Sequence, residues 1–368
     1  MPDSASPATS PPTPAPSKDA AAEALPDAVG DSGSALASDA SARDGHADAV
    51  AGPGPSGPPD AALQFAADAG PIDAAVPTPT DASANRRGIP MGAPWVSYYG
   101  SAAASGGVDK VASSFRLVNI DADPGAGLFT RAEIRQLQSA GQNEVVGYLD
   151  VGSCEKYRTW WASAPGYKSC SANTAAQVGP YGGYPDEVWM NLGNADYQDL
   201  IVGYVAPLIA AQGVDGFFLD NLEIVEHGAS SRDGPCDAAC SQGGLDLVRK
   251  LRSAFPDKLI VMNNTTSDVT RLGMTGGVPF ASLLDGLSRE GVYEPAYDSV
   301  AEAQLVAWQS LGLKPGGRPF WIGTEDYVSS CTATSVATRV YALSRAKGFS
   351  PYATDSSSGQ MVICYWGF

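Results

Sequence analysis

The stretch VDGFFLD, residues 214–220, is a short apolar run that ends on a carboxylate. Similar runs recur along the chain and are separated by helical patterns, which is typical of βα units around a parallel sheet. Because a unit of this kind repeats eight times, the sequence predicts the α/β class and a (β/α)8 TIM barrel, for which about 250 residues is typical. The expected strands are 95–99, 115–121, 145–150, 214–220, 259–263, 283–290, 320–326 and 349–355.

The first quarter of the 368-residue chain has a different composition. Up to about residue 90 it consists almost entirely of Ala, Pro, Ser, Asp, Gly and Thr. Such a segment cannot bury enough apolar surface to offset the cost of ordering it, roughly 1 to 2 kcal/mol per residue. We therefore expect residues 1–90 to be a disordered tether and residues 91–368 to form the barrel domain.

The formal net charge of −17 argues against nucleic acid as a partner, because binding a phosphate backbone needs a basic surface. The six cysteines favour disulfides and an oxidising compartment. Zinc at Cys236 and Cys240 is the competing interpretation, but it needs further ligands, and His227 is the one histidine after residue 90. No metal or cofactor is expected. Proximity in sequence suggests the pairs Cys154–Cys170, Cys236–Cys240 and Cys331–Cys364.

The sequence holds no run of about 20 apolar residues that would span a membrane. Residues 1–4 show neither the basic nor the apolar region of a signal peptide. The Ala/Pro/Asp-rich start is similar to the spacer that follows the anchor of a bacterial lipoprotein. We therefore expect an extracytoplasmic protein, secreted or tethered to a membrane through its N-terminus.

Local signals predict where several helices begin and end. Thr130-x-x-Glu133 and Ser299-x-x-Glu302 fit the capping box, in which a hydroxyl and a carboxylate accept the free N–H groups of the first turn. The apolar spacing of residues 197–209 predicts an amphipathic helix, kinked or split at Pro207. Residues 154–193 form a connection too long for an ordinary βα loop, and long loops of this kind are usually functional.

Most of the expected strands end on a polar residue, and in a TIM barrel all these ends meet at one mouth. Asp220 and Glu290 are the strongest catalytic candidates, because each ends an apolar strand that holds its direction rigidly. Asp121 and Asp355 are explained equally well as residues that begin loops or cap helices. The remaining polar ends are Asp150, Asn263 and Asp326.

The absence of certain residue types and motifs narrows the class of reaction. With a single histidine after residue 90, neither a Ser-His-Asp triad nor a two-histidine metal site can form, and no G-x-S-x-G or H-E-x-x-H motif occurs. Chemistry by two carboxylates remains, and hydrolysis of glycosidic bonds is its commonest form. Aromatic residues near the strand ends, such as Tyr98, Trp189 and Tyr327, fit this interpretation because sugar rings stack on flat aromatic faces.

The chain resembles glycoside hydrolase family 114, the endo-α-1,4-polygalactosaminidase type of barrel, from Trp95 to about Asp355. The most specific segment is GYLDVGSCEKYR, residues 147–158, which is similar to the family's Tyr-Ile-Ser-Val-Gly-x-x-Glu-x-Tyr-Arg. Other matching segments are WVSYYG (95–100), LVNID (117–121), the pair Asp-Gly before Asp220-Asn221, the pair Asp-Gly before Arg289-Glu290, and Asp326-Tyr327.

The resemblance implies roles for individual residues. Asp220 is the expected nucleophile and Glu290 the expected acid/base, with Glu294 as the nearest alternative acid. Asp150 stands where the family usually has Ser, which leaves the exact sugar open. The residues expected to bind substrate are Tyr98, Asp121, Asp150, Glu155, Tyr157, Arg158, Trp189, Asn221, Asn263, Asp326 and Tyr327.

These observations predict a glycosidase that cleaves an α-linked, galactosamine-type polysaccharide by a retaining mechanism. The alternatives are a carbohydrate-binding barrel without hydrolytic activity, which holds a surface polysaccharide, and a structural scaffold. The separation of the Asp220 and Glu290 carboxyls discriminates between them. A retaining enzyme requires about 5–5.5 Å, and an inverting enzyme about 6.5–9.5 Å.

Overall fold

The structure, a computed structural model, describes residues 88–368. Residues 1–87 of the tether expected over residues 1–90 lie outside this range. Eight parallel strands form one sheet in the order β1-β2-β3-β7-β8-β11-β12-β13. They are β1 (Trp95–Tyr98), β2 (Leu117–Ile120), β3 (Glu144–Asp150), β7 (Gly216–Asp220), β8 (Leu259–Asn263), β11 (Gly286–Glu290), β12 (Trp321–Val328) and β13 (Ser350–Asp355).

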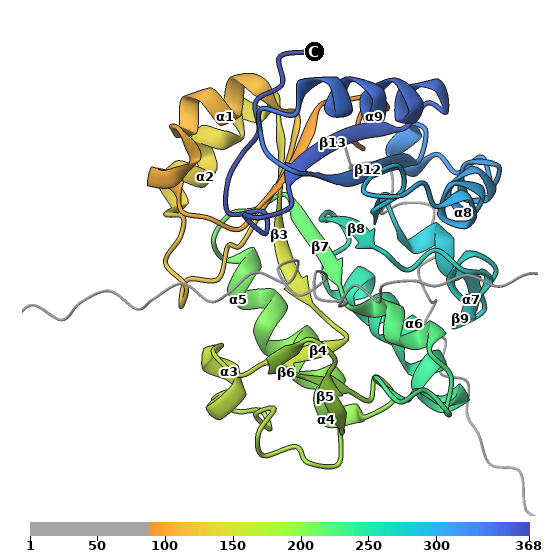
Figure 1. Cartoon of the computed structure of the whole chain (residues 1–368). Helices are drawn as coiled ribbons and strands as arrows, with labels where there is room; N and C mark the ends of the chain where they lie inside the picture. The colour runs from red at the N-terminus through yellow and green to blue at the C-terminus, as the bar shows by residue number, and fades with distance from the viewer. Residues whose placement is uncertain (1–87) are drawn as a thin grey trace, which may run out of the picture. The chain divides into compact units, whose positions relative to one another are not determined.

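The sheet curls into a nearly closed barrel, so the predicted (β/α)8 fold is confirmed (Figure 1). Its first and last strands are joined through a side chain, because the indole Nε1 of Trp95 donates to the carbonyl oxygen of Ser350 at 2.8 Å. The Trp95 ring also contacts the rings of Phe218, Trp321 and Tyr352. All four side chains are buried, so aromatic rings fill the barrel interior.

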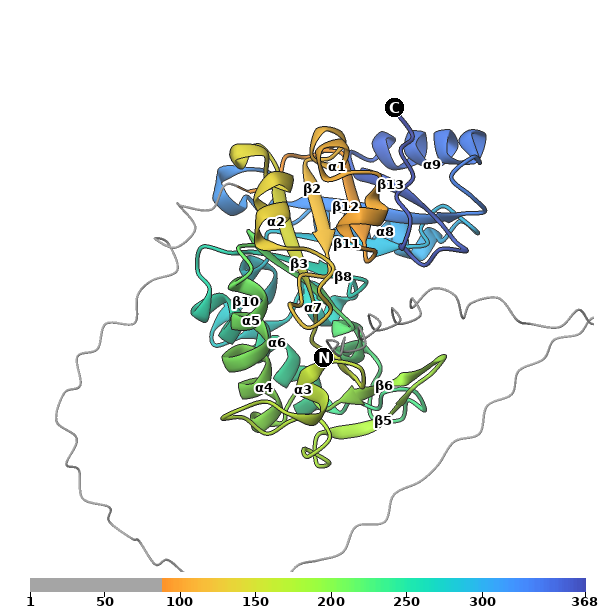
Figure 2. The ribbon, with the colours of Figure 1, turned by 90° about the vertical axis from the view of Figure 1, so that its left-hand side faces the viewer.

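Helices cover the outer face of the barrel, which explains why most strands are apolar on both faces. Figure 2 shows α1 and α2 on the outer side of β2. The α-helices are α1 (Val108–Ser114), α2 (Arg131–Leu137), α3 (Thr159–Ala162), α4 (Ala195–Leu200), α5 (Ala206–Ala210), α6 (Ala238–Ala254), α7 (Asp268–Arg271), α8 (Ser299–Gln309) and α9 (Thr334–Ala346). Short helical turns are η2 (Ala102–Ser105), η3 (Ser139–Gly141), η4 (Ile201–Val205), η5 (Leu222–Glu226), η6 (Phe280–Leu283) and η7 (Pro315–Gly317).

One of the two predicted capping boxes is confirmed. At the start of α2 the Glu133 N–H donates to Thr130 Oγ1 at 3.2 Å, and the Thr130 N–H donates to Glu133 Oε2 at 2.7 Å. The box predicted at Ser299 is wrong, because Asp298 caps α8 instead. Its carboxylate accepts two N–H groups of the first turn at 2.9 Å each, which makes Ser299 the first helical residue.

The helix predicted over residues 197–209 is split, as expected. Residues of α4 continue through the π-helical turn η4 into α5, and Pro207 lies at the start of α5. Proline has no N–H to donate to the preceding turn, so the regular hydrogen-bond ladder cannot pass through it. A π-turn directly before the proline accommodates this interruption.

The long connection over residues 154–193 carries secondary structure of its own. Together with Ser153 it forms the antiparallel sheet β4-β6-β5, made of β4 (Ser153–Glu155), β6 (Tyr184–Met190) and β5 (Gln177–Tyr181). Both views place this sheet beyond the carboxyl end of β3 (Figures 1 and 2). The inserted sheet therefore lies on the same side of the barrel as the carboxyl ends of the strands. A second small sheet pairs β9 (Met274–Thr275) with β10 (Val278–Pro279).

All six cysteines form disulfides, in the three predicted pairs Cys154–Cys170, Cys236–Cys240 and Cys331–Cys364. The zinc interpretation of Cys236 and Cys240 is thereby excluded. Within residues 88–368 no helix combines the length and the apolarity needed to span a bilayer.

Candidate active site

Four strand ends bring polar side chains to the same side of the sheet. Asp150 on β3 lies opposite Asp220 on β7, and Asn263 on β8 lies opposite Ser288 on β11. Glu290 follows two residues after Ser288, so its side chain points the same way. The barrel mouth therefore combines Asp150, Asp220, Asn263 and Glu290, as the sequence predicts.

Asp220 and Glu290 are connected by one amide group. Asn263 Nδ2 donates to Asp220 Oδ1 at 3.1 Å and to Glu290 Oε1 at 2.6 Å. These two carboxyl oxygens are therefore separated by at most the sum of the two distances, about 5.7 Å. Asp220 is buried and Glu290 is half-buried, so Glu290 is the more accessible of the pair.

Neighbouring strands hold both Asn263 and Glu290. The Ser288 hydroxyl donates to Asn263 Oδ1 at 2.7 Å, which directs Nδ2 of the amide toward the carboxyls. The Tyr327 hydroxyl donates to Glu290 Oε2 at 2.8 Å, and Asn264 Oδ1 accepts the Glu290 N–H at 3.0 Å. Glu290 is thus oriented from both β8 and β12.

The alternative acid, Glu294, has a different partner. Its carboxylate forms an ion pair with Arg339 on α9. Burial and neighbouring strands therefore direct Glu290 toward Asp220, whereas Glu294 is engaged by a helix outside the barrel.

Arg158 is the centre of a buried ionic cluster. Its guanidinium donates to Glu155 Oε2 at 2.6 Å, to Asp121 Oδ2 at 2.8 Å and to Asp123 Oδ2 at 3.2 Å. Burial raises the pKa of Asp121, and the charge of Arg158 opposes this effect. Burial alone would lower the pKa of Arg158, but the carboxylates outweigh it and raise that pKa well above its usual value. Arg158 therefore stays charged and links Glu155 on β4 to the segment that follows β2.

Tyr157 joins this cluster from the solvent side. Its hydroxyl donates to Glu155 Oε1 at 2.5 Å, and 49% of the residue is exposed. Among the predicted binding residues, Tyr157 thus presents an accessible aromatic ring beside the Arg158 cluster.

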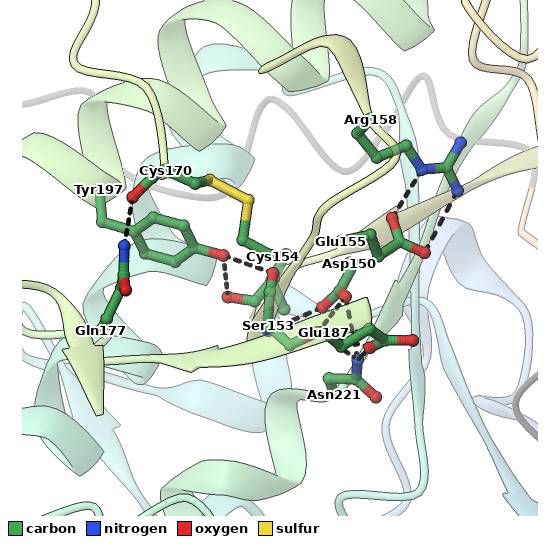
Figure 3. Close-up of a disulfide and its surroundings, with 11 residues drawn as sticks. Asp150, Ser153, Cys154, Glu155, Arg158, Cys170, Gln177, Glu187, Tyr197 and Asn221 are labelled. Atoms are coloured by element: carbon green, nitrogen blue, oxygen red, sulfur yellow. Dashed lines mark hydrogen bonds and ion pairs between the residues drawn. A yellow bond between two sulfur atoms is a disulfide. The ribbon is translucent and has the colours of Figure 1, made fainter. Parts of the chain in front are cut away.

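A second polar cluster links β3, the inserted sheet and the end of β7 (Figure 3). Ser153 Oγ lies 2.5 Å from Asp150 Oδ2 and 2.7 Å from Glu187 Oε2. Asn221 Nδ2 donates to Asp150 Oδ2 and to Ser153 Oγ, both at 3.0 Å. Burial raises the pKa of Tyr148 well above its usual value, and Glu155, Asp220, Asp150 and Glu187 add to the rise. Tyr148 is therefore a neutral phenol among four carboxyl groups.

Glu187 was missed in the sequence. It lies within an insertion instead of at the end of a barrel strand, so the rule that located the other acids does not apply to it. The register of the inserted sheet pairs Glu155 with Glu187. Residues 184–190 read YPDEVWM and show no period-two alternation, and the strand partner that would fix the direction of Glu187 is not evident from the sequence.

The structure corrects the expected orientation of Tyr98 and Asp326. Successive side chains of a strand point to opposite faces, so the inward positions are occupied by Tyr99 and Tyr327. Tyr98 is buried and donates to the carbonyl oxygen of Ser101 at 2.8 Å. Asp326 is fully buried and accepts the N–H groups of Tyr293 and Glu294 at 2.5 and 3.0 Å. Both residues stabilise the surroundings of the mouth without facing it.

Trp189 is also buried, with 1% of its surface exposed. Its indole donates to Asp233 at 2.6 Å, and Tyr181 stacks on it at a ring separation of 4.0 Å. The Tyr181 hydroxyl donates to Asn221 Oδ1 at 3.4 Å. Trp189 therefore supports Tyr181, which is half-buried.

Asp355 begins a turn, because its carboxylate accepts the Ser357 N–H at 2.9 Å. This position agrees with the interpretation of Asp355 as a residue that begins a loop.

A (β/α)8 barrel with two carboxyl groups at its mouth is the arrangement typical of glycoside hydrolases. Residues 76–242 match the model of the glycoside-hydrolase family GH114, so the resemblance to this family that the sequence indicates is confirmed. The part of this match before residue 88 lies outside the described residues. No curated protein matches the chain.

Two solved structures share the fold. The glycoside hydrolase domain of PelA from Pseudomonas aeruginosa is 16% identical, with a TM-score of 0.54 over 73% of this chain and 98% of that domain. Ega3 from Aspergillus fumigatus, solved in complex with galactosamine, is 15% identical, with a TM-score of 0.52 over 73% of this chain and 93% of the other. At these identities the likeness concerns the fold.

Proposed function

We propose that the chain is a retaining glycoside hydrolase in which Asp220 is the nucleophile and Glu290 the acid/base. The observation that carries this proposal is the Asn263 amide, which limits the nearest Asp220 and Glu290 oxygens to about 5.7 Å. This limit agrees with the separation of about 5–5.5 Å in retaining enzymes and is shorter than the 6.5 Å or more, roughly, of inverting ones.

The reaction takes two steps in this proposal. Glu290 gives its proton to the leaving glycosidic oxygen while Asp220 attacks the anomeric carbon, and a covalent glycosyl-enzyme forms. Glu290, now ionised, takes a proton from water, and the resulting oxygen displaces Asp220 from the sugar. Asn263 keeps the two carboxyls at a fixed separation throughout, because an amide donates to them in either protonation state.

We further propose an α-linked polysaccharide with free amino groups, of galactosamine type, as the substrate. Buried carboxyl groups at the mouth favour a cationic ligand, and the mouth has Asp150, Glu187 and Asp220 in addition to the Arg158 cluster. The galactosamine in the complex of Ega3 supports the same sugar class. Tyr181 offers an aromatic surface on which a sugar ring can stack.

The location proposed for the enzyme is extracytoplasmic, either secreted or tethered through the N-terminal region. Three disulfides support it, because disulfides persist in oxidising compartments.

Hydrolysis is tested by incubating the protein with polygalactosamine, its acetylated form and neutral α-glucans while new reducing ends are measured. The expected result is release from polygalactosamine, reduced at high salt because charge attraction is screened. Equal release from a neutral α-glucan without salt dependence would contradict electrostatic selection. Binding without release would instead support the carbohydrate-binding barrel.

The catalytic roles are tested with Asp220→Asn and Glu290→Gln, which should each remove nearly all turnover, and with Glu294→Gln as the matched control. Loss in Glu294→Gln but not in Glu290→Gln would show that the acid is misassigned. NMR of the first product should show the α-anomer, whereas a β-anomer would refute retention.

A further inference from the structure

Ser153 Oγ has three close polar neighbours (Figure 3). Asp150 Oδ2 lies at 2.5 Å, Glu187 Oε2 at 2.7 Å and Asn221 Nδ2 at 3.0 Å. The amide nitrogen of Asn221 can only donate, whereas a hydroxyl has one hydrogen to donate and two lone pairs to accept. Ser153 therefore accepts from Asn221 and can donate to only one of the two carboxyl groups.

The other carboxyl group must then donate to Ser153, which requires a proton on it. We infer that Asp150 and Glu187 share one proton through Ser153 Oγ, and that this group positions Asn221 and the neighbouring nucleophile Asp220. The positioning role rests on the function proposed above, whereas the shared proton does not.

Burial gives the shared proton a physical reason. Asp150 is 7% exposed and Glu187 is 3% exposed, and their bridged oxygens are separated by at most the sum of two contacts, about 5.2 Å. Two ionised carboxylates this close and this buried repel each other, and protonation of one removes the repulsion. The guanidinium of Arg158, in the neighbouring cluster, forms ion pairs with Asp121, Asp123 and Glu155.

Other titratable groups face this cluster from every surrounding element. Asp220 comes from β7, Glu155 from β4, Tyr148 from β3 and Tyr197 from α4. The carboxyls among them add negative charge, and burial raises the pKa of both phenols well above the usual value. A proton on one carboxyl group of the pair reduces the negative charge that these groups concentrate here.

The cluster is linked to the nucleophile through the chain. Asn221 directly follows Asp220 and adopts φ of 60°, a left-handed conformation that is uncommon for residues other than glycine. Val151 N–H donates to the carbonyl oxygen of Asp220 at 3.0 Å. Gly152 allows the close approach of the two segments, because a Cβ there would lie 1.7 Å from the Asn221 carbonyl oxygen. The position of Asn221 therefore determines where β7 ends.

Asp150 is the position at which this sequence departs from the Ser of the family's segment. A serine there would remove one of the two carboxyl groups that contact Ser153 Oγ, and with it the shared proton. The inference is therefore specific to this chain.

Infrared difference spectroscopy near neutral pH tests the shared proton without any substrate. The carbonyl stretch of a protonated carboxylic acid should lose the intensity of one group in Glu187→Gln and in Asp150→Asn, relative to the wild type. The double variant should lose no more than either single variant, since the two residues hold one proton together. Asp186→Asn, at the exposed neighbouring position of β6, is the matched control and should lose none.

No loss in either single variant, or a doubled loss in the double variant, would overturn the sharing. The positioning role is tested by turnover. Glu187→Gln should retain a kcat about tenfold higher than that of Glu187→Ala, because its amide can donate to Ser153 as the protonated acid does. Glu187→Ala and Ser153→Ala should each lower kcat about 10²-fold with little change in KM, by misplacement of the nucleophile.

Equal kcat values for Glu187→Gln, Glu187→Ala and Ser153→Ala would overturn the positioning role. Circular dichroism and thermal unfolding of each variant separate these effects from misfolding. If no variant and no wild-type protein turns over substrate, the proposed hydrolase activity fails, and the infrared result still decides the shared proton.

Discussion

We expect Asp326→Asn to change stability in a pH-dependent way. The free energy of unfolding of the variant minus that of the wild type should rise as the pH rises. Asp326 lies on β12, is fully buried and accepts two N–H groups from the segment that follows Glu290. Burial raises the pKa of Asp326 from 3.8 to about 7, although the two N–H donors oppose the rise. Asparagine keeps an acceptor oxygen for both donors and cannot ionise.

The magnitude follows from proton linkage. Between pH 4 and pH 7, approximately, the native protein binds a proton at Asp326 that the unfolded chain releases, so wild-type stability falls as the pH rises through this range. The difference between 3.8 and about 7 corresponds to about 4 kcal/mol. This cost is absent below about pH 4 and complete above about pH 7. The buried NH2 group of asparagine adds a cost of about 1–3 kcal/mol that does not depend on pH.

The assay is denaturant-induced unfolding of both proteins from pH 4 to pH 8.5 with the disulfides intact. The free energy of unfolding of Asp326→Asn minus that of the wild type should rise by about 4 kcal/mol across this range, because only the wild type pays to ionise the site. Asp257→Asn, at an exposed position, is the control and should give a constant difference. A constant difference for Asp326→Asn as well would refute the reasoning.

Three further outcomes are expected. Asn263→Ala should lower kcat about 10²-fold without unfolding the protein, since it removes the bridge between the two carboxyls, and an unchanged kcat would exclude a role for the bridge. Replacement of Cys154 and Cys170 by Ser should lower the free energy of unfolding by about 3 kcal/mol, measured with denaturant; no change would show that the cross-link is not stabilising. Tyr181→Ala should raise KM about tenfold, whereas Tyr181→Phe should restore it if ring stacking is the cause.

The barrel strands were predictable because each is a short apolar run that must be covered on both faces. The acids at the mouth were predictable for a related reason. A carboxylate that directly follows such a run marks the end of the strand. Asp150, Asp220 and Glu290 were therefore expected at the carboxyl ends of their strands, which meet at the barrel mouth. Parallel pairing then brings strands that are far apart in sequence to the same mouth.

The face of the sheet toward which a side chain points was harder to predict than its position along the strand. Tyr98 and Asp326 lie at the correct strand ends but on the outer face, one residue away from the inward positions of Tyr99 and Tyr327. Alternation along each strand contains this information once the register is known. A shift by one residue moves the side chain to the other face, so strand bounds that are uncertain by one residue cannot decide it.

Tertiary contacts that depend on inserted segments were not predictable. Glu187 reaches the site through the pairing of β6 with β4, and no local pattern states which strand β6 joins. The same holds for Arg158, two of whose three carboxylate partners, Asp121 and Asp123, come from the distant segment after β2. For Arg158, the family segment at 147–158 predicted its importance but not its partners.

Both proposed carboxyl pairs use an asparagine at the end of a barrel strand. Asn263 donates to Asp220 and Glu290, and Asn221 donates to Asp150 and Ser153. An amide donates two hydrogens at every pH, whereas a lysine or arginine in the same place would add a charge and hold both carboxyls ionised. A retaining mechanism needs the acid to alternate between two protonation states while its distance to the nucleophile stays fixed. A neutral amide would meet both requirements of the proposed mechanism, and an asparagine side chain contacts each of the two carboxyl pairs.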